Sequence, residues 1–288
     1  RWLMAAAAIA LLSVTLVLGQ TRFGAANWII LGPLSFQPSE VAKLGIILSF
    51  AAMISAFGEK METFRWGIAP FAAILAVIVV LLRLEPHNSA IVIIVCTAGA
   101  MLFLGGVKYR WFILGGLAML LGLILILGAG GYEASRITAW QDPFSDPTDD
   151  GYQIIQSLYA IGSGGLFGLG FGQGRQKYLY LPEEHNDYIF SIACEELGLV
   201  GAAAILLLYA LLILRGYWIS MHIRDRFLSL TVAGITTLTA LQVFFNIDMV
   251  TNLLPSTGIS LPFFSYGGTA LLIQLGEMGI ILGASRQC

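Results

Sequence analysis

Long apolar runs constrain the fold of this chain more than any other feature. About eight stretches approach the roughly 20 mainly apolar residues that a helix needs to cross the hydrocarbon core of a bilayer. They cover residues 2–19, 38–57, 67–83, 89–106, 111–130, 188–214, 227–247 and 263–284. A backbone in lipid must satisfy its own hydrogen bonds, so these runs predict helices. We therefore expect an all-α, polytopic membrane protein with about eight transmembrane helices in a single domain, residues 1–288.

Composition supports the membrane class and argues against two other functions. Charged residues make up only 11% of the chain, whereas a soluble domain has about 25%. A net charge of −2 gives no basic face for a nucleic acid, so no nucleic-acid partner is expected. Cys96, Cys194 and Cys288 show no metal-ligand spacing, which predicts unpaired thiols.

The distribution of lysine and arginine predicts the orientation of the chain. If Arg1 is cytoplasmic, the inner loops hold nine of the fifteen basic residues. These are Arg1, Lys60, Arg65, Lys108, Arg110, Arg215, Arg224, Arg226 and Arg286. The positive-inside rule then places the large 131–187 loop on the extracytoplasmic side.

The 131–187 loop is too long to be a simple connection, and loops of this length are usually functional or disordered. Apolar residues recur at helical spacing between Ile154 and Ile161, which predicts a short helix. An apolar segment in the membrane interface is expected next. The aromatic residues of the loop suit the depth of lipid headgroups, namely Tyr152, Phe167, Phe171, Tyr178 and Tyr180.

Acidic residues gather where this loop enters the next apolar run. Asp187 stands at that border, so it is either a partly desolvated general base or the N-cap of the helix. Glu195 and Glu196 follow inside the run, where buried carboxylates are usually paired. Either a structural partner or a catalytic or ion-binding role would explain them.

Basic residues on the same side form a second candidate group. Arg136, Arg175 and Lys177 suit an anionic, phosphate-bearing substrate, and lipid headgroups are the alternative ligands. Lys43 either pairs with Glu40 three residues earlier or lines an outer cavity.

Three further patterns have weaker meanings. The glycine run between Gly162 and Gly174 has no βαβ context, so closely packed backbone is favoured over a phosphate cradle. The 252–269 stretch, which includes Ser265, predicts irregular backbone that lines a groove. The turn that contains Glu85 and His87 is read as either a polar turn or a ligand site.

Five stretches together resemble the SEDS family, the shape, elongation, division and sporulation proteins that include FtsW, RodA and SpoVE. They are QPSEVAK (37–43), GYQIIQS (151–157), AIGSGGLFGLGFG (160–172), QKYLYLPEEHNDYIFSIACEELG (176–198) and LPSTGISLPFFSYGG (254–268). They occur in the family order, and the similarity covers essentially the whole chain. The QK that precedes the YLPE segment looks more like FtsW or SpoVE than RodA.

The resemblance implies a ten-helix peptidoglycan glycosyltransferase of the bacterial plasma membrane that polymerises lipid II during division or sporulation. The essential aspartate of the family falls on Asp187. The remaining site residues that we expect are Arg136, Arg175, Lys177, Lys43, Glu196, Gln153 and Ser265. Expected partners are a class B penicillin-binding protein and other divisome proteins. No cofactor is implied, and a divalent cation, Mg²⁺ or Mn²⁺, at the diphosphate is left open.

Departures from the family pattern and two rival functions complete the expectations. Asn27 and His87 stand where relatives often carry an arginine and an acidic group. Two helices that would precede residue 1 are missing, which suggests an N-terminally truncated chain. A flippase or transporter of lipid-linked precursors is one alternative, suggested by Glu195, Glu196 and Glu277 inside apolar runs. A non-catalytic scaffold for the transpeptidase is the other.

Overall fold

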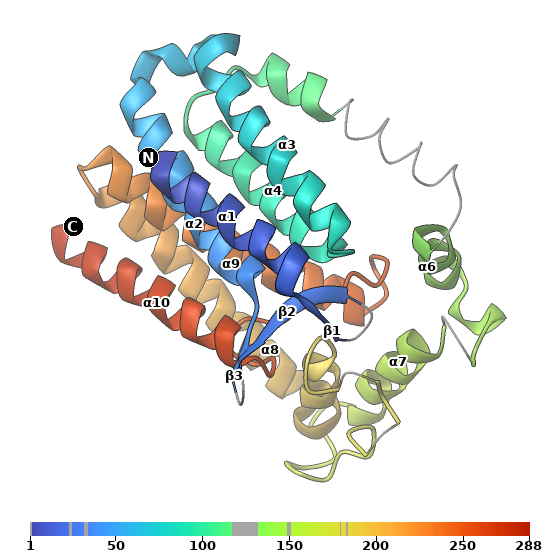
Figure 1. Cartoon of the computed structure of the whole chain (residues 1–288). Coiled ribbons are helices and arrows are strands. Elements are labelled where there is room, and N and C mark those ends of the chain that lie inside the picture. Colours follow the sequence, from blue (N-terminus) through green and yellow to red (C-terminus); the bar gives the residue numbers. More distant parts are fainter. Residues whose placement is uncertain are drawn as a thin grey trace. The chain divides into compact units, whose positions relative to one another are not determined.

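The computed structural model describes residues 2–22, 25–31, 34–116, 132–148, 151–178, 180–182 and 184–288. These residues fall into two compact units. The first unit contains Arg1–Ile113, Leu212–Leu241 and Gly267–Cys288, and the second contains Leu114–Leu211 and Gln242–Tyr266. The long helices α8 and α9 contribute to both (Figure 1).

Helices dominate both units, as the sequence predicts. The first unit begins with α1 (Trp2–Leu18), α2 (Pro38–Phe57), α3 (Ala69–Leu84) and α4 (Asn88–Leu104). The short turns η1 (Gly58–Glu62) and η2 (Phe64–Ile68) connect α2 to α3. The later helices are α6 (Tyr132–Gln141), η3 (Pro143–Ser145), α7 (Tyr152–Gly164), α8 (Ile189–His222), α9 (Arg226–Val250), α10 (Gly268–Ala284) and η4 (Ser285–Gln287).

Five helical stretches in the described part of the chain are long and apolar enough to cross a membrane. They are Pro38–Glu62, Phe64–Leu84, Ile189–His222, Arg226–Val250 and Gly268–Gln287, and shorter apolar helices cover Ala5–Leu16 and Asn88–Leu104. The predicted span 111–130 lies mostly outside the described residues, with a helix over 109–116 at its start. The chain is therefore a multi-pass membrane protein, and the predicted number of eight spans stays a prediction.

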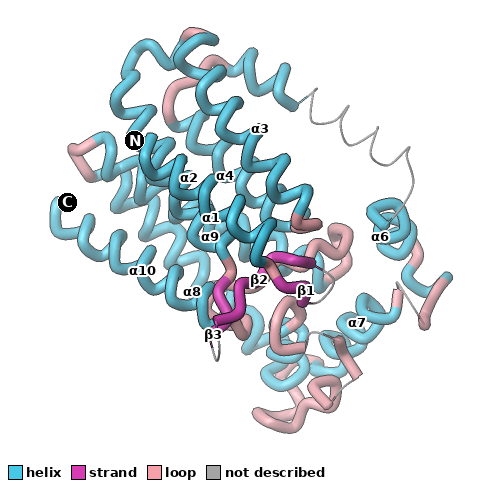
Figure 2. Tube along the Cα trace, in the orientation of Figure 1, coloured by secondary structure: helices cyan, strands magenta, loops and turns pink. Residues whose placement is uncertain are grey.

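A small antiparallel sheet joins α1 to α2, where the sequence suggested only a loop (Figure 2). Its strands are β1 (Gln20–Arg22), β2 (Ala25–Leu31) and β3 (Leu34–Phe36), in the order β1-β2-β3. Ile29 pairs with Phe36 and Leu31 with Leu34 in the β2–β3 ladder. Strands this short carry little periodicity in the sequence, which is why apolar patterning did not indicate them.

The first unit is a helical bundle in which α1, α2, α3 and α4 run side by side (Figure 1). Pro38 opens α2, where its missing N–H costs nothing. Phe50 of α2 meets Phe71 of α3 edge to face, with ring centroids 4.8 Å apart. Gly216 of α8 lets Thr236 of α9 approach closely, because an added Cβ would lie 2.4 Å from the Thr236 hydroxyl.

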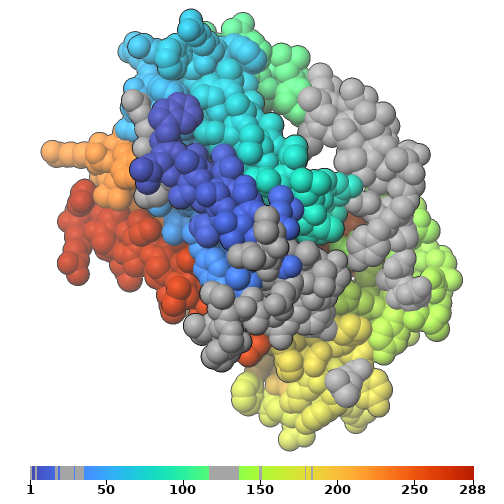
Figure 3. Space-filling model, viewed as in Figure 1, coloured from blue at the N-terminus to red at the C-terminus, as the bar shows by residue number. Residues whose placement is uncertain are grey.

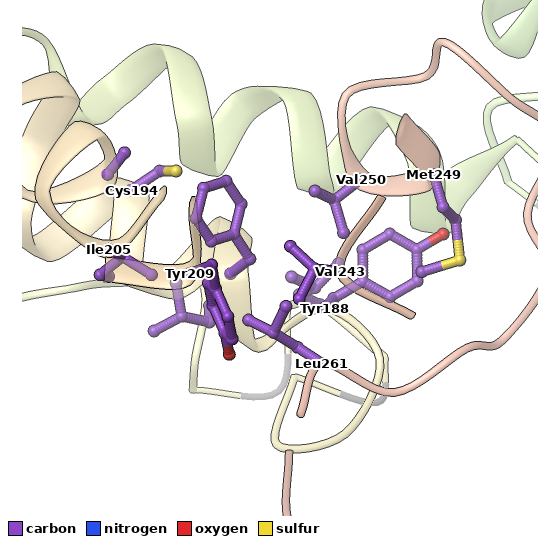
Figure 4. Packing of buried hydrophobic residues seen from close by; sticks show 12 residues of the cluster. Tyr188, Cys194, Ile205, Tyr209, Val243, Met249, Val250 and Leu261 are labelled. Carbon is purple, nitrogen blue, oxygen red and sulfur yellow. The ribbon is translucent and has the colours of Figure 1, made fainter. Parts of the chain in front are cut away.

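The second unit is built around a cluster of buried apolar side chains (Figure 4). Members of the cluster include Tyr188 from the loop before α8, Ile205 and Tyr209 from the middle of α8, and Val243 from α9. The hydroxyl of Ser157 in α7 lies 2.7 Å from the Ser191 hydroxyl in α8 and donates to the Val250 carbonyl at 2.7 Å. The predicted short helix of the 131–187 loop is therefore α7, and buried polar contacts hold it against α8 and α9.

Candidate active site

The segment that precedes α8, residues 182–187, is held by hydrogen bonds to its carbonyl groups. Gln153 of α7 donates from Nε2 to the Pro182 carbonyl at 3.2 Å. The Tyr266 amide donates to the His185 carbonyl at 2.8 Å. The first bond ties the segment to α7 and the second ties it to the loop before α10.

Two further carbonyls of this segment bind the elements that follow α8. The Ser265 hydroxyl donates to the Asn186 carbonyl at 2.7 Å. Asn246 of α9 donates from Nδ2 to the carbonyls of Asp187 and Ile259, at 2.7 and 2.8 Å. The backbone that carries Asp187 is therefore fixed from three directions, while its carboxyl side chain is only half-buried.

Helix α6 places Arg136 on the loop that follows α9. Arg136 Nη1 donates to the Ser256 carbonyl at 2.7 Å. Trp140 donates from Nε1 to the Asn252 carbonyl at 3.1 Å, and Asn252 Nδ2 donates back to the Trp140 carbonyl at 3.3 Å. These contacts dock α6 against residues 252–256 and give the guanidinium a defined place.

Asp187 and Arg136 both lie close enough to Tyr188 for their charges to act on its phenol. The buried phenol donates to the Ser256 hydroxyl at 3.4 Å. Burial raises the pKa of Tyr188 to about 12; the Ser256 hydrogen bond lowers it, the charge of Asp187 raises it and that of Arg136 lowers it. The charges of a carboxylate and of a guanidinium therefore both act on this phenol. A carboxylate can serve as a base, and a guanidinium can bind an anion.

Glu196 and Lys177 hold the loop that follows the glycine run. Glu196 accepts hydrogen bonds from Lys177 Nζ at 2.7 Å and from the amides of Gly172 and Gly174, at 2.9 and 3.3 Å. The hydrogen bond from Glu196 raises the pKa of Lys177. The structural partners that were expected for Glu196 are therefore present, and the charge of Lys177 has a partner in it.

Glu195 binds the same loop through its backbone. It is almost completely buried and accepts from the amides of Arg175 and Gln176, at 2.9 and 3.2 Å from the nearest carboxylate oxygen. The Arg175 side chain is exposed. The glycine run packs closely against α8, as expected, and carboxylates of the protein occupy the amides at and after its end.

Lys43 belongs to the first unit, whereas the other predicted site residues belong to the second. Its Nζ lies 2.8 Å from a carboxylate oxygen of Glu40, and both side chains are buried. The predicted i,i+3 pair is therefore confirmed. Nearby, burial and the Lys43 charge lower the pKa of His87 to about 4, and burial raises the pKa of Glu85 to about 7.

The structure adds residues that the sequence did not single out for the site. Asn246 and Trp140 bind the backbone around Asp187 and Arg136, although neither stood out in a motif. A polar amide inside the apolar run of α9 is a signal that could have pointed to Asn246. Among the described residues, no three His, Cys, Asp or Glu side chains could hold a metal ion. A divalent cation that arrives with a diphosphate stays an untested prediction.

Comparisons with known proteins agree with this architecture. Stage V sporulation protein E of Bacillus subtilis (strain 168) is 41% identical over 268 residues, covering 93% of this chain and 73% of that protein. A probable peptidoglycan glycosyltransferase FtsW of Geobacter sp. (strain M18) is 40% identical over 270 residues, covering 94% and 74%.

Solved structures show the same fold. One chain comes from a structure described as showing structural coordination of polymerization and crosslinking by a peptidoglycan synthase complex. It matches with a TM-score of 0.84 and 29% identity over 99% of this chain and 80% of that one. The rod shape determining protein RodA of Thermus thermophilus matches with a TM-score of 0.70 and 29% identity, over 98% and 76%. The family of FtsW, RodA and SpoVE, described as cell cycle proteins, matches residues 1–288, and this chain belongs to it.

Proposed function

We propose that this chain is a peptidoglycan glycosyltransferase that polymerises lipid II, with Asp187 as its general base. The relatives named as glycosyltransferases support the enzyme class. One observation supports the site: the backbone of Asp187 is pinned by Asn246, and its charge acts on the same buried phenol as that of Arg136.

In the proposed reaction, a carboxylate oxygen of Asp187 takes the proton from the 4-hydroxyl of the acceptor sugar. The oxygen of that hydroxyl attacks the anomeric carbon of the donor sugar, and the bond from this carbon to the diphosphate breaks. Polyprenyl diphosphate leaves with the electron pair, and the configuration at the anomeric carbon inverts. A positioned base of this kind contributes about 10²–10⁴-fold to a rate.

The cations of the second unit would stabilise the charge that develops on the leaving diphosphate. Arg175 is the best placed by exposure, since its guanidinium is exposed while Glu195 fixes its amide. Arg136 would act closer to Asp187. Lys177 would contribute its positive charge from the position that Glu196 gives it.

The setting of the enzyme is part of the proposal. The 131–187 loop would face the extracytoplasmic side of the bacterial plasma membrane, where lipid II would be used. A class B penicillin-binding protein would be the transpeptidase partner, because a structural neighbour of this chain belongs to a peptidoglycan synthase complex. Other divisome proteins would join them during division or sporulation.

The test compares purified parent protein with Asp187→Asn in liposomes that contain lipid II, each with the partner transpeptidase. We expect glycan strands from the parent and a loss of about 10²–10⁴-fold in the variant, the range for a missing general base. Glu184→Gln, which neutralises a nearby carboxylate that contacts His185 at 3.4 Å, serves as the matched control and should keep activity.

Folding of each variant is checked by gel filtration and thermal unfolding in detergent. Equal polymer from parent and Asp187→Asn would rule out Asp187 as the base. Lipid II that crosses the bilayer without being polymerised by the parent would instead identify a transporter.

A further inference from the structure

An exposed apolar segment follows α7 and has no role in the proposed chemistry. We call residues 165–171 the apolar strap. Three of its large side chains are largely exposed: Leu166 by 62%, Phe167 by 80% and Phe171 by 87%. Figure 3 shows yellow atoms, the colour of this part of the chain, at the molecular surface. Adjacent exposed apolar side chains of this kind mark an interaction surface.

The backbone of the strap is bonded to α8. Four hydrogen bonds join them: Leu169 and Gly170 donate to the Glu195 and Glu196 carbonyls at 3.0 Å each, and Leu199 and Val200 donate to the Gly165 and Leu166 carbonyls at 2.9 and 3.1 Å. The strap therefore supplies partners for helix groups that lack them at a break in α8. Irregular backbone is tolerated at membrane depth only when its polar groups are satisfied in this way.

Two glycines make this contact possible. Gly198, with φ of 67°, interrupts α8, and Gly168, with φ of 77°, lies against it. A Cβ on Gly198 would lie 2.3 Å from the Gly168 amide nitrogen, and one on Gly168 would lie 2.1 Å from the Glu196 carbonyl oxygen. The two backbones therefore touch at a distance that side chains would prevent.

The position of the break along α8 indicates how deep the strap lies. The part after the break, 199–222, is by itself longer than the roughly 20 residues that cross a bilayer. Leu199 and Val200, the first residues of that part, are exposed by 62% and 56% on a membrane helix. The strap is hydrogen-bonded to these two residues, so its exposed apolar side chains continue the exposed apolar surface of α8 at one end of the span.

We propose that the apolar strap is embedded in the bilayer, at the boundary between headgroups and acyl chains next to the 131–187 loop. Phe167 and Phe171 would insert there, where aromatic side chains are favoured. The polar network of Glu195, Glu196 and Lys177 lies just before the break, and therefore on the headgroup side. One consequence rests on the proposed function: the strap would set the depth in the membrane at which Arg175 binds a lipid-linked diphosphate.

The test measures the depth of nitroxide labels in the full chain. Cys96, Cys194 and Cys288 are replaced by alanine, and single cysteines at Phe167 or Phe171 are labelled after reconstitution into vesicles of phosphatidylethanolamine and phosphatidylglycerol. A label at Leu207, which is 60% exposed within the span, is the lipid reference, and a label at the exposed Thr148 is the water reference.

We expect both strap labels to collide with oxygen several-fold more, and with a water-soluble nickel complex several-fold less, than the Thr148 label does. Their depth should be shallower than that of the Leu207 label. Labels that behave like the Thr148 label at both positions would overturn the proposal. Protection from the nickel complex that appears only when the transpeptidase is added would also overturn it, since the strap would then be a protein interface.

A second measurement addresses the consequence for the substrate. The double variant Phe167→Ser and Phe171→Ser should raise the KM for lipid II several-fold and leave kcat unchanged. The control is Phe144→Ser, which changes an exposed phenylalanine outside the strap. The depth measurement does not depend on activity, so a failure of the glycosyltransferase proposal and a failure of the strap proposal give different results.

Discussion

Asn246 is the residue on which the geometry of Asp187 depends most directly. Its amide is fully buried in α9 and donates to two carbonyls, those of Asp187 and Ile259. Removing a donor leaves a buried carbonyl unpaired, at a cost of about 1–3 kcal/mol for each. The residue therefore links the stability of the second unit to the position of the proposed base.

We predict that Asn246→Leu lowers the thermal unfolding temperature in detergent and slows glycan synthesis. The pH dependence of the remaining activity should be unchanged, because Asn246 acts on the backbone of Asp187. Thr251→Val is the control, since Thr251 follows α9 and its hydroxyl donates to the carbonyls of Ile247 and Asp248 in the last turn of that helix, at 2.7 and 3.3 Å. Unfolding temperatures that are equal for Asn246→Leu and the parent would contradict this role.

His87 gives a second prediction at this scale, in the pH dependence of stability. Its pKa is about 4 in the folded protein, against 6.5 for an unperturbed histidine, so the unfolded chain binds more protons between these values. Stability linked to His87 is therefore complete above about pH 6.5 and is lost as the pH falls toward 4. Between pH 7 and pH 5, the unfolding temperature of the parent should therefore fall relative to that of His87→Gln, which has no histidine to protonate at this position. A constant difference would show that His87 is not buried in its neutral form.

At the scale of elements, the break in α8 is the least conventional feature of the fold. We predict that Gly198→Ala destabilises the protein by more than the roughly 1–2 kcal/mol of a left-handed non-glycine residue, because the added Cβ also meets backbone at 2.3 Å. Gly276→Ala in α10 is the matched control, since nothing lies within 4 Å of its added Cβ. Comparable unfolding temperatures for the two variants would mean that α8 is not broken at Gly198.

The sequence predicted the apolar helices well and the contacts between distant segments poorly. Apolar runs located α2 and α9 closely, because hydrophobic length is a local property. The bonds from Leu199 and Val200 to the strap join residues more than thirty positions apart, and no local pattern encodes them. The same limit applies to α6, whose docking depends on Asn252 and Ser256.

Over the whole molecule, the sequence predicted which residues belong to the candidate site but not which groups each of them contacts. Acidic residues at the border of an apolar run and inside it were enough to single out Asp187, Glu195 and Glu196. Only the structure shows that the two glutamates bind the amides of their own loop. Lys43 shows a second limit of the sequence. It was grouped with the other candidate residues by its chemistry, whereas the structure places it in the first unit and Asp187 in the second.

Orientation in the membrane gives the last prediction, and it concerns the entire chain. Single cysteines at Thr148 and at Arg224 probe the 131–187 loop and the short turn between α8 and α9. A membrane-impermeant maleimide applied to intact cells should label the first position and not the second, because the positive-inside rule predicts that the turn is cytoplasmic. After the cells are permeabilised, both positions should react, which controls for burial. If only Arg224→Cys were labelled in intact cells, the true topology would be the reverse of the predicted one, and Asp187 would lie on the cytoplasmic side.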